Sequence, residues 1–155
     1  MRLFRRTAMP VSAADVYAFH ERPDALMRLI PPWEHIRVLI PPASLAKGTH
    51  VVVKQWVGPI PFTIESVHDA CQPGVGFVDR MVRGPFAHWV HEHRFEQVSA
   101  TASWLVDDVD YALPLEPLSA IVRPLVERRV ERMFAFRHQV TLRAMQELAR
   151  ERKTN

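Results

Sequence analysis

The 155-residue sequence is short of cysteine and glycine, and it has no long uninterrupted run of apolar residues. Its single cysteine, Cys71, excludes an internal disulfide and a zinc site built from cysteine ligands. The basic segment 1–6 is not followed by an apolar stretch of signal-peptide length, and nothing approaches the roughly 20 apolar residues that span a bilayer. These absences predict a cytoplasmic protein without stable membrane insertion.

The sequence also lacks internal repeats and low-complexity segments, and it has no strong excess of positive or negative residues. The hydrophobic content of 48% and the charged content of 24% are typical of a globular chain that buries a core, and the length predicts one domain over residues 1–155. The net charge is +3, and the excess of positive charge after residue 116 is diluted by glutamates at helical spacing. We therefore expect no nucleic acid partner and no cofactor.

What the sequence does contain is a change of hydrophobic period along the chain. After a first strand over residues 3–9, the pattern predicts two short helices, the first of which begins with a capping-box sequence at Ser12 and Asp15. Period-2 alternation and frequent turns of two to five residues then predict an antiparallel meander. The predicted helices cover residues 12–19 and 25–29, and the predicted later strands cover residues 36–40, 49–57, 62–69, 76–82, 86–96 and 101–113.

The segment after residue 116 returns to the helical period. Apolar residues at steps of three or four predict one long amphipathic helix. Pro117 suits its first turn, whereas Pro124 should kink the helix or mark a break just before Val126. The predicted apolar stripe consists of Leu118, Val122, Val126, Val130, Met133, Phe136, Val140, Ala144 and Leu148.

One such helix cannot fill the concave side of a large, strongly twisted sheet. The layers therefore predict an α+β fold, in which a curved antiparallel sheet of six to seven strands wraps around a long C-terminal helix, with two short helices after the first strand. Either large side chains fill the remaining space or a cavity is left, and such a cavity is where a small molecule would bind.

The candidate site lies on neighbouring predicted strands whose side chains alternate between two faces. On two of these strands, one face mixes aromatic rings with imidazoles and a carboxylate. Such a face is too polar for an ordinary core and too apolar for a solvated surface, so it indicates the wall of a pocket. The predicted ligand-binding residues, including two from the helix, are Asp79, Trp89, His91, His93, Phe95, Leu105, Asp107, Tyr111, Met133 and Arg137.

The predicted turn positions give a hypothesis for how these strands pair. A turn at residues 84–85 places Asp79 across from about position 89 or 90. A turn centred on Val98 places Leu105 opposite His91 and Asp107 opposite Trp89. In this register Asp79, Trp89, His91 and Asp107 share one patch on the concave face.

Four interpretations of this patch remain open. In the structural one, the carboxylates orient His91 and the indole of Trp89 in a self-satisfied network. In the second, the imidazoles and Tyr111 bind the polar end of an apolar ligand. In the third, His91 or His93 is a general base positioned by a carboxylate. In the last, the His-x-His pair and Asp79 ligate a metal ion, but such pairs are common and no metal is expected.

Arg137 lies beside the apolar stripe near the middle of the predicted helix. Its long side chain can extend to solvent, or it can turn inward and pair with a ligand carboxylate or an acidic residue of the sheet. Of these, we expect solvent exposure or a structural ion pair.

A set of motifs spread over nearly the whole chain resembles a known superfamily. The motifs are Phe19-His20-Glu21-Arg22-Pro23-Asp24-Ala25-Leu26, Pro31-Pro32-Trp33-Glu34, Phe77-x-Asp79-x-Met81, Gly84-Pro85-Phe86 with Trp89-x-His91-x-His93-x-Phe95, Asp107-x-Val109-x-Tyr111-x-Leu113-Pro114, and Phe134-Ala135-Phe136-Arg137-His138. With the order of elements, they resemble the helix-grip fold of the SRPBCC superfamily, and within it a bacterial ligand-binding family. The superfamily includes START-like and polyketide cyclase/dehydrase-like proteins.

This resemblance implies a pocket for a small hydrophobic or amphipathic molecule, such as a lipid, quinone, isoprenoid or polyketide-like compound. We expect a binding protein inside the cell rather than an enzyme. One alternative is a cyclase/dehydratase-type enzyme that uses His91, His93 and Asp79 for proton transfer. Another is an interaction domain that docks through its basic C-terminal helix on a partner or an anionic membrane. Formation of a homodimer is left open.

Overall fold

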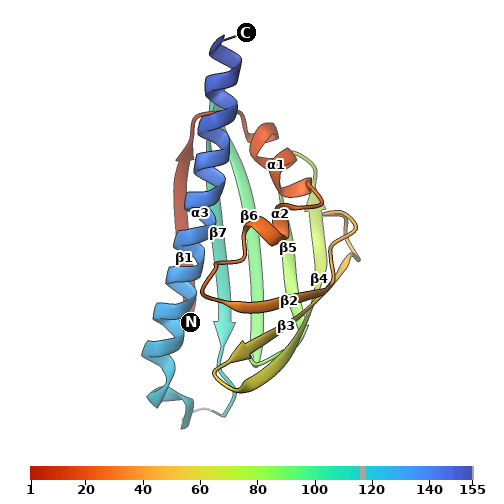
Figure 1. Ribbon diagram of the computed structural model, residues 1–155, viewed down its shortest axis with the longest axis vertical. Coiled ribbons are helices and arrows are strands. Elements are labelled where there is room, and N and C mark those ends of the chain that lie inside the picture. Colours follow the sequence, from red (N-terminus) through yellow and green to blue (C-terminus); the bar gives the residue numbers. More distant parts are fainter. Residues whose placement is uncertain (116–117, 155) are drawn as a thin grey trace.

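The computed structural model describes residues 1–115 and 118–154, which form one curved sheet and a long C-terminal helix (Figure 1). The order of strands and helices is the one predicted for this α+β fold, with the two short helices directly after the first strand. In chain order the elements are β1 (Arg2–Met9), α1 (Ala13–Glu21), α2 (Ala25–Arg28), β2 (His35–Ile40), β3 (His50–Val57), β4 (Ile60–Gln72), β5 (Gly76–Arg83), β6 (His88–Ser99), β7 (Ala102–Ala112), a short 3-10 helix η1 (Leu118–Ile121) and α3 (Arg123–Thr154).

The seven strands form a single antiparallel sheet in the order β1-β7-β6-β5-β4-β3-β2. The first strand therefore pairs with the last one, and the strands between them follow one another as a meander. In Figure 1, β2 and β3 run across the direction of β5 and β6, so the sheet is strongly curved. Register shifts within β4, at 65–66 and 68–70, contribute to this curvature because a bulge increases local twist.

The pairing of β6 with β7 differs from the predicted register. Asp107 lies opposite His93, Leu105 opposite Phe95, and Trp89 opposite Tyr111, so the predicted pairs of Asp107 with Trp89 and Leu105 with His91 are wrong. The cause is that β6 extends to Ser99 through an irregularity, which moves the turn two residues beyond Val98. Because the error is an even number of residues, every side chain keeps its predicted face.

The long helix α3 begins at Arg123, so Pro124 lies in its first turn, where the missing N–H breaks no helical hydrogen bond. The predicted break before Val126 therefore falls earlier, between η1 and α3. The predicted position of Pro117 lies outside the described residues. The face of α3 that is fully buried also differs from the predicted stripe and consists of Val130, Phe134, His138, Thr141 and Met145.

The helix α1 has the predicted capping box. The backbone N–H of Asp15 donates to the Ser12 hydroxyl over 3.3 Å, and the backbone N–H of Ser12 donates to the Asp15 carboxylate over 3.2 Å. Arg152, near the end of α3, donates to the same carboxylate over 2.7 Å. This ion pair joins the start of α1 to the end of α3.

Two apolar clusters form the core, one at each end of the contact between α3 and the sheet. The first surrounds α1 and includes Met9, Phe95 and Met145, and the second includes Tyr111 and Phe134. Between them α3 presents the polar side chains of His138 and Thr141 to the sheet. Among the described residues, no helix has both the length and the hydropathy needed to cross a bilayer.

Candidate functional site

A cavity of about 630 Å³ lies between the curved sheet, α2, η1 and α3. Its volume falls within the range of roughly 300–1,000 Å³ that is usual for sites that bind small molecules. Most of the lining is aliphatic or aromatic, and the strands β3, β4 and β5 contribute much of it. Representative apolar lining residues are Leu29, Val53, Phe62, Ile64, Met81 and Val126.

The structure divides the predicted ligand-binding residues into two groups. Those on the cavity wall are Asp79, Trp89, His91, His93, Met133 and Arg137. The others do not line the cavity and are buried behind it: Phe95, Leu105, Asp107 and Tyr111. For the three residues of β7, the reason is that α3 lies along β1 and reaches Asp107 through His138, so the inward face of β7 meets the helix instead of the open space. Phe95 of β6 instead packs against Tyr17 of α1.

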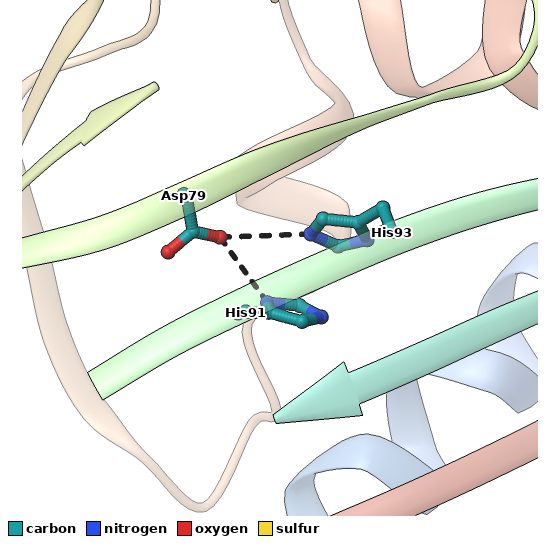
Figure 2. A group of neighbouring side chains, drawn as sticks. All are labelled: Asp79, His91 and His93. Carbon is teal, nitrogen blue, oxygen red and sulfur yellow. Dashed lines mark ion pairs between the residues drawn. The ribbon is translucent and has the colours of Figure 1, made fainter. Parts of the chain in front are cut away.

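Three of the cavity-lining side chains converge at the polar end of the cavity (Figure 2). Asp79 on β5 lies directly opposite His91 on β6, and His93 is the next residue on the same face of β6. Asp79 Oδ2 is 3.1 Å from His91 Nδ1 and 3.6 Å from His93 Nε2. Two imidazoles of β6 thus point at one carboxylate oxygen of the neighbouring strand β5.

A second carboxylate, that of Asp107, supports both imidazoles from behind. Asp107 Oδ1 is 3.3 Å from His91 Nε2 and 2.9 Å from His93 Nδ1. Its other oxygen is 3.0 Å from His138 Nε2, and His138 Nδ1 is 2.7 Å from the hydroxyl of Thr7. We call these residues the buried polar network: Thr7, Asp79, His91, His93, Asp107 and His138.

Sequence reasoning did not select His138 as a site residue. A signal was available, because His138 follows Phe134 by four residues and precedes Thr141 by three. That spacing places a polar side chain on the same helix face as buried residues. A buried polar group needs a partner, so a histidine on that face indicates an acceptor in the sheet.

The charges of the buried polar network follow from its contacts. Burial raises the pKa of the Asp79 and Asp107 carboxyls, but the surrounding histidines reverse this, and each pKa lies well below its usual range. Burial lowers the pKa of His91, yet Asp107 and Asp79 together raise it to about 9. The two carboxylates therefore favour the charged form of His91.

Arg137 reaches the cavity wall from the middle of α3. Its Nε is fully buried without a hydrogen-bond partner, and its guanidinium lies 5.3 Å from the centre of the Phe134 ring. Burial lowers the pKa of this guanidinium, although the charges of Asp107, Asp79 and Glu34 act in the opposite direction. By contrast, Arg129 on the same helix is paired with Glu34, with Nε 3.1 Å from Oε1. Within residues 1–115 and 118–154, Arg137 has no ion pair.

The opposite end of the cavity is rimmed by exposed aliphatic side chains. Leu115, Leu118 and Val122 line the cavity, and they are 76%, 74% and 48% exposed. Ile121 lies between them in the chain and is 87% exposed. We call Leu115, Leu118, Ile121 and Val122 the apolar rim.

Solved structures with the same fold cover nearly the whole chain. The Zhui aromatase/cyclase from Streptomyces sp. R1128 has a TM-score of 0.74 and 17% identity, with 94% of this chain and 93% of that chain covered. Norcoclaurine synthase from Thalictrum flavum has a TM-score of 0.70 and 13% identity, with 95% and 87% covered. A nucleoside-diphosphate sugar epimerase from Corynebacterium glutamicum has a TM-score of 0.67 and 22% identity, with 96% and 30% covered. At these identities the likeness concerns the fold alone.

None of the curated proteins matches the sequence. A family model described as "Polyketide cyclase / dehydrase and lipid transport" matches residues 9–137. The match begins at Met9, the last residue of β1, contains the whole meander, and ends at Arg137 near the middle of α3. The seven-stranded sheet, its grip on α3 and the two short helices after β1 agree with the helix-grip fold of the SRPBCC superfamily. The chain therefore belongs to the polyketide cyclase/dehydrase and lipid transport family of that superfamily.

Proposed function

We propose that the protein binds a small amphipathic molecule that is apolar over most of its length and ends in an acidic group. The observation that carries this proposal is the unpaired guanidinium of Arg137 in the wall of an otherwise apolar cavity. Arg137 is half-buried, and its charge has no ion pair among the described residues. A partly buried charge of this kind is poorly hydrated, because the surrounding apolar groups cannot replace water. A carboxylate on the ligand would supply that partner in a bidentate contact that guanidinium groups favour.

The cavity also fits the apolar part of such a ligand. Between Arg137 and the apolar rim, the wall is formed by aliphatic and aromatic side chains of the sheet and by Val126 and Met133 of α3. Removing apolar surface from water contributes about 25 cal/mol per Å². This region therefore adds affinity for the apolar part of a ligand without discriminating between ligands by their polar groups. Candidate ligands are fatty acids and acidic isoprenoid, quinone-derived or polyketide-like compounds.

The test compares two probes that differ only in their polar end, dodecanoate and dodecanol. The protein is first delipidated, and binding is measured by calorimetry. We expect wild-type protein to prefer dodecanoate by at least about tenfold, since a hydrogen bond to a charged group contributes about 1.5–3 kcal/mol. Arg137→Met should remove this preference while leaving the affinity for dodecanol unchanged.

The matched control is Arg143→Met, because Arg143 is an exposed arginine on the same helix. It should bind both probes like the wild type. Equal affinity of the wild type for the acid and the alcohol would contradict the role of Arg137. Two results together would contradict ligand binding itself. One is that neither probe binds, and the other is that mass spectrometry finds no molecule retained after the protein is exposed to a hydrophobic extract.

A further inference from the structure

We propose that Asp79, His91 and His93 bind a divalent transition-metal ion at the polar end of the cavity. One ligand atom from each of them, a carboxylate oxygen and two imidazole nitrogens, lies within 4.8 Å of the other two. Zinc–nitrogen and zinc–oxygen bonds of about 2.0–2.2 Å place the ligand atoms of a tetrahedral site roughly 3.5 Å apart. Small side-chain rotations therefore bring all three atoms onto one ion (Figure 2).

The strongest support comes from the opposite side of the two imidazoles. Each ring presents one nitrogen to Asp79 and the other to Asp107. A histidine that ligates a metal typically donates its remaining N–H to a carboxylate, which fixes its tautomer and orientation. Asp107 is placed to accept from both rings at once, and its second oxygen is held by His138. Asp107 and His138 thus already hold the two imidazoles in the orientation that metal binding requires.

Hydrogen bonds do not fully pair the atoms on the Asp107 side of this arrangement. His91 Nε2, His93 Nδ1 and Asp107 Oδ1 are buried and lie at ion-pair distance, yet none makes a well-aligned hydrogen bond. The 3.6 Å between His93 Nε2 and Asp79 is also too long for one. A metal ion beside Asp79 would displace the Nδ1 proton of His91 to solvent and bind His91 Nδ1 and His93 Nε2 through their lone pairs. The remaining N–H of each ring would then donate to Asp107.

The ligand set also indicates which ions fit. Two imidazoles with one carboxylate suit Zn²⁺, Fe²⁺, Co²⁺ or Ni²⁺, whereas Ca²⁺ and Mg²⁺ prefer sites made of oxygen atoms. Three protein ligands leave at least one coordination position open. Because Asp79, His91 and His93 all line the cavity, that position faces the space where a ligand would bind. The site does not depend on the role proposed for Arg137.

The test uses the full-length protein stripped with EDTA and titrated with ZnCl₂ by calorimetry, and with CoCl₂ by visible absorption. We expect one equivalent to bind, with Co²⁺ giving the absorption bands of a nitrogen- and oxygen-ligated site of low coordination number. The variants Asp79→Asn and His93→Ala should weaken Zn²⁺ binding by at least about 100-fold. Asp107→Asn, which changes only the support, should weaken it by about 10–100-fold.

The control variant is His88→Gln, because His88 is an exposed histidine on the same strand, β6. It should bind Zn²⁺ like the wild type, and circular dichroism of each variant shows whether it is folded. Absence of stoichiometric binding to wild-type protein would overturn the proposal, and this result does not depend on any variant being folded. So would Zn²⁺ binding that Asp79→Asn and His93→Ala leave unchanged.

Discussion

The polar end of the cavity and the apolar rim are built in opposite ways. At the polar end, Asp107 is 3% exposed and touches three imidazoles that come from β6 and α3. At the rim, Leu118 and Ile121 are more than 70% exposed, and they belong to η1, which has only one turn. Each side chain at the polar end is held by partners far away in the sequence, whereas those at the rim face solvent.

This difference indicates that the two ends have separate roles. Changing a group in the buried polar network leaves its former partners buried and unpaired, so stability and chemistry are coupled there. Changing a rim residue removes little buried surface, so stability should change little, and under the proposed function the change should alter ligand entry. Four predictions follow, in addition to those for Arg137 and for the metal ion.

The largest effect is expected for Asp107→Ala. The substitution leaves His91, His93 and His138 without their shared acceptor, and removing one partner of a buried ion pair typically costs about 3–5 kcal/mol. The free energy of unfolding in urea should fall by that amount. Asp110→Ala on the same strand is the control, because Asp110 is 66% exposed and its loss should cost less than about 0.5 kcal/mol. Equal losses of stability from the two substitutions would contradict a stabilising role of Asp107 at the polar end.

An intermediate effect is expected from pH on the polar end. The folded-state pKa of His91, about 9, lies above the ordinary value of 6.5, so the native state binds more protons than the unfolded state between these values. The contribution of His91 is complete below about pH 6.5 and is lost as the pH rises to about 9. Urea denaturation in the presence of EDTA should show this decline, and His91→Gln should reduce its slope. A wild-type stability that is constant over this range would argue against a charged His91.

His20 should act in the opposite direction at lower pH. Burial, followed by the neighbouring His93, lowers the pKa of His20 to about 4, so between pH 4 and 6.5 the unfolded state binds more protons. Its contribution to stability is present above about pH 6.5 and is lost as the pH falls through 4. The same denaturation series, extended to pH 4.5, measures this decrease, and His20→Gln is the matched variant.

The smallest effect on stability is expected at the apolar rim. The double substitution Leu118→Ser and Ile121→Ser should change the free energy of unfolding by less than about 1 kcal/mol, since both side chains already face solvent. It should instead slow the association of dodecanoate in stopped-flow measurements. A large loss of stability would show that the rim belongs to the core after all, which would undo the comparison between the two ends.

Several features of the site were predictable from sequence because they depend on local periodicity. The alternation in β6 correctly places His91 and His93 on the same face, and the turns correctly order β5, β6 and β7. Local pattern did not reveal that Phe95 and Tyr111 pack in the core while Trp89 borders the cavity. All three share the inward face, and the placement of α1 and α3 on that face decides which of them is covered: Phe95 packs against Tyr17 of α1, and Tyr111 lies in the cluster that contains Phe134 of α3.

The sequence by itself determined the order of the elements, the antiparallel meander, the long terminal helix and the face that each strand presents, because these depend on residues a few positions apart. Only the tertiary structure decided that His138 meets Asp107 and Thr7, which lie 31 and 131 positions away along the chain. It also decided that Arg129 is paired with Glu34 and Arg137 is not. These partnerships depend on how one helix lies on a curved sheet, and no pattern within either element fixes that placement.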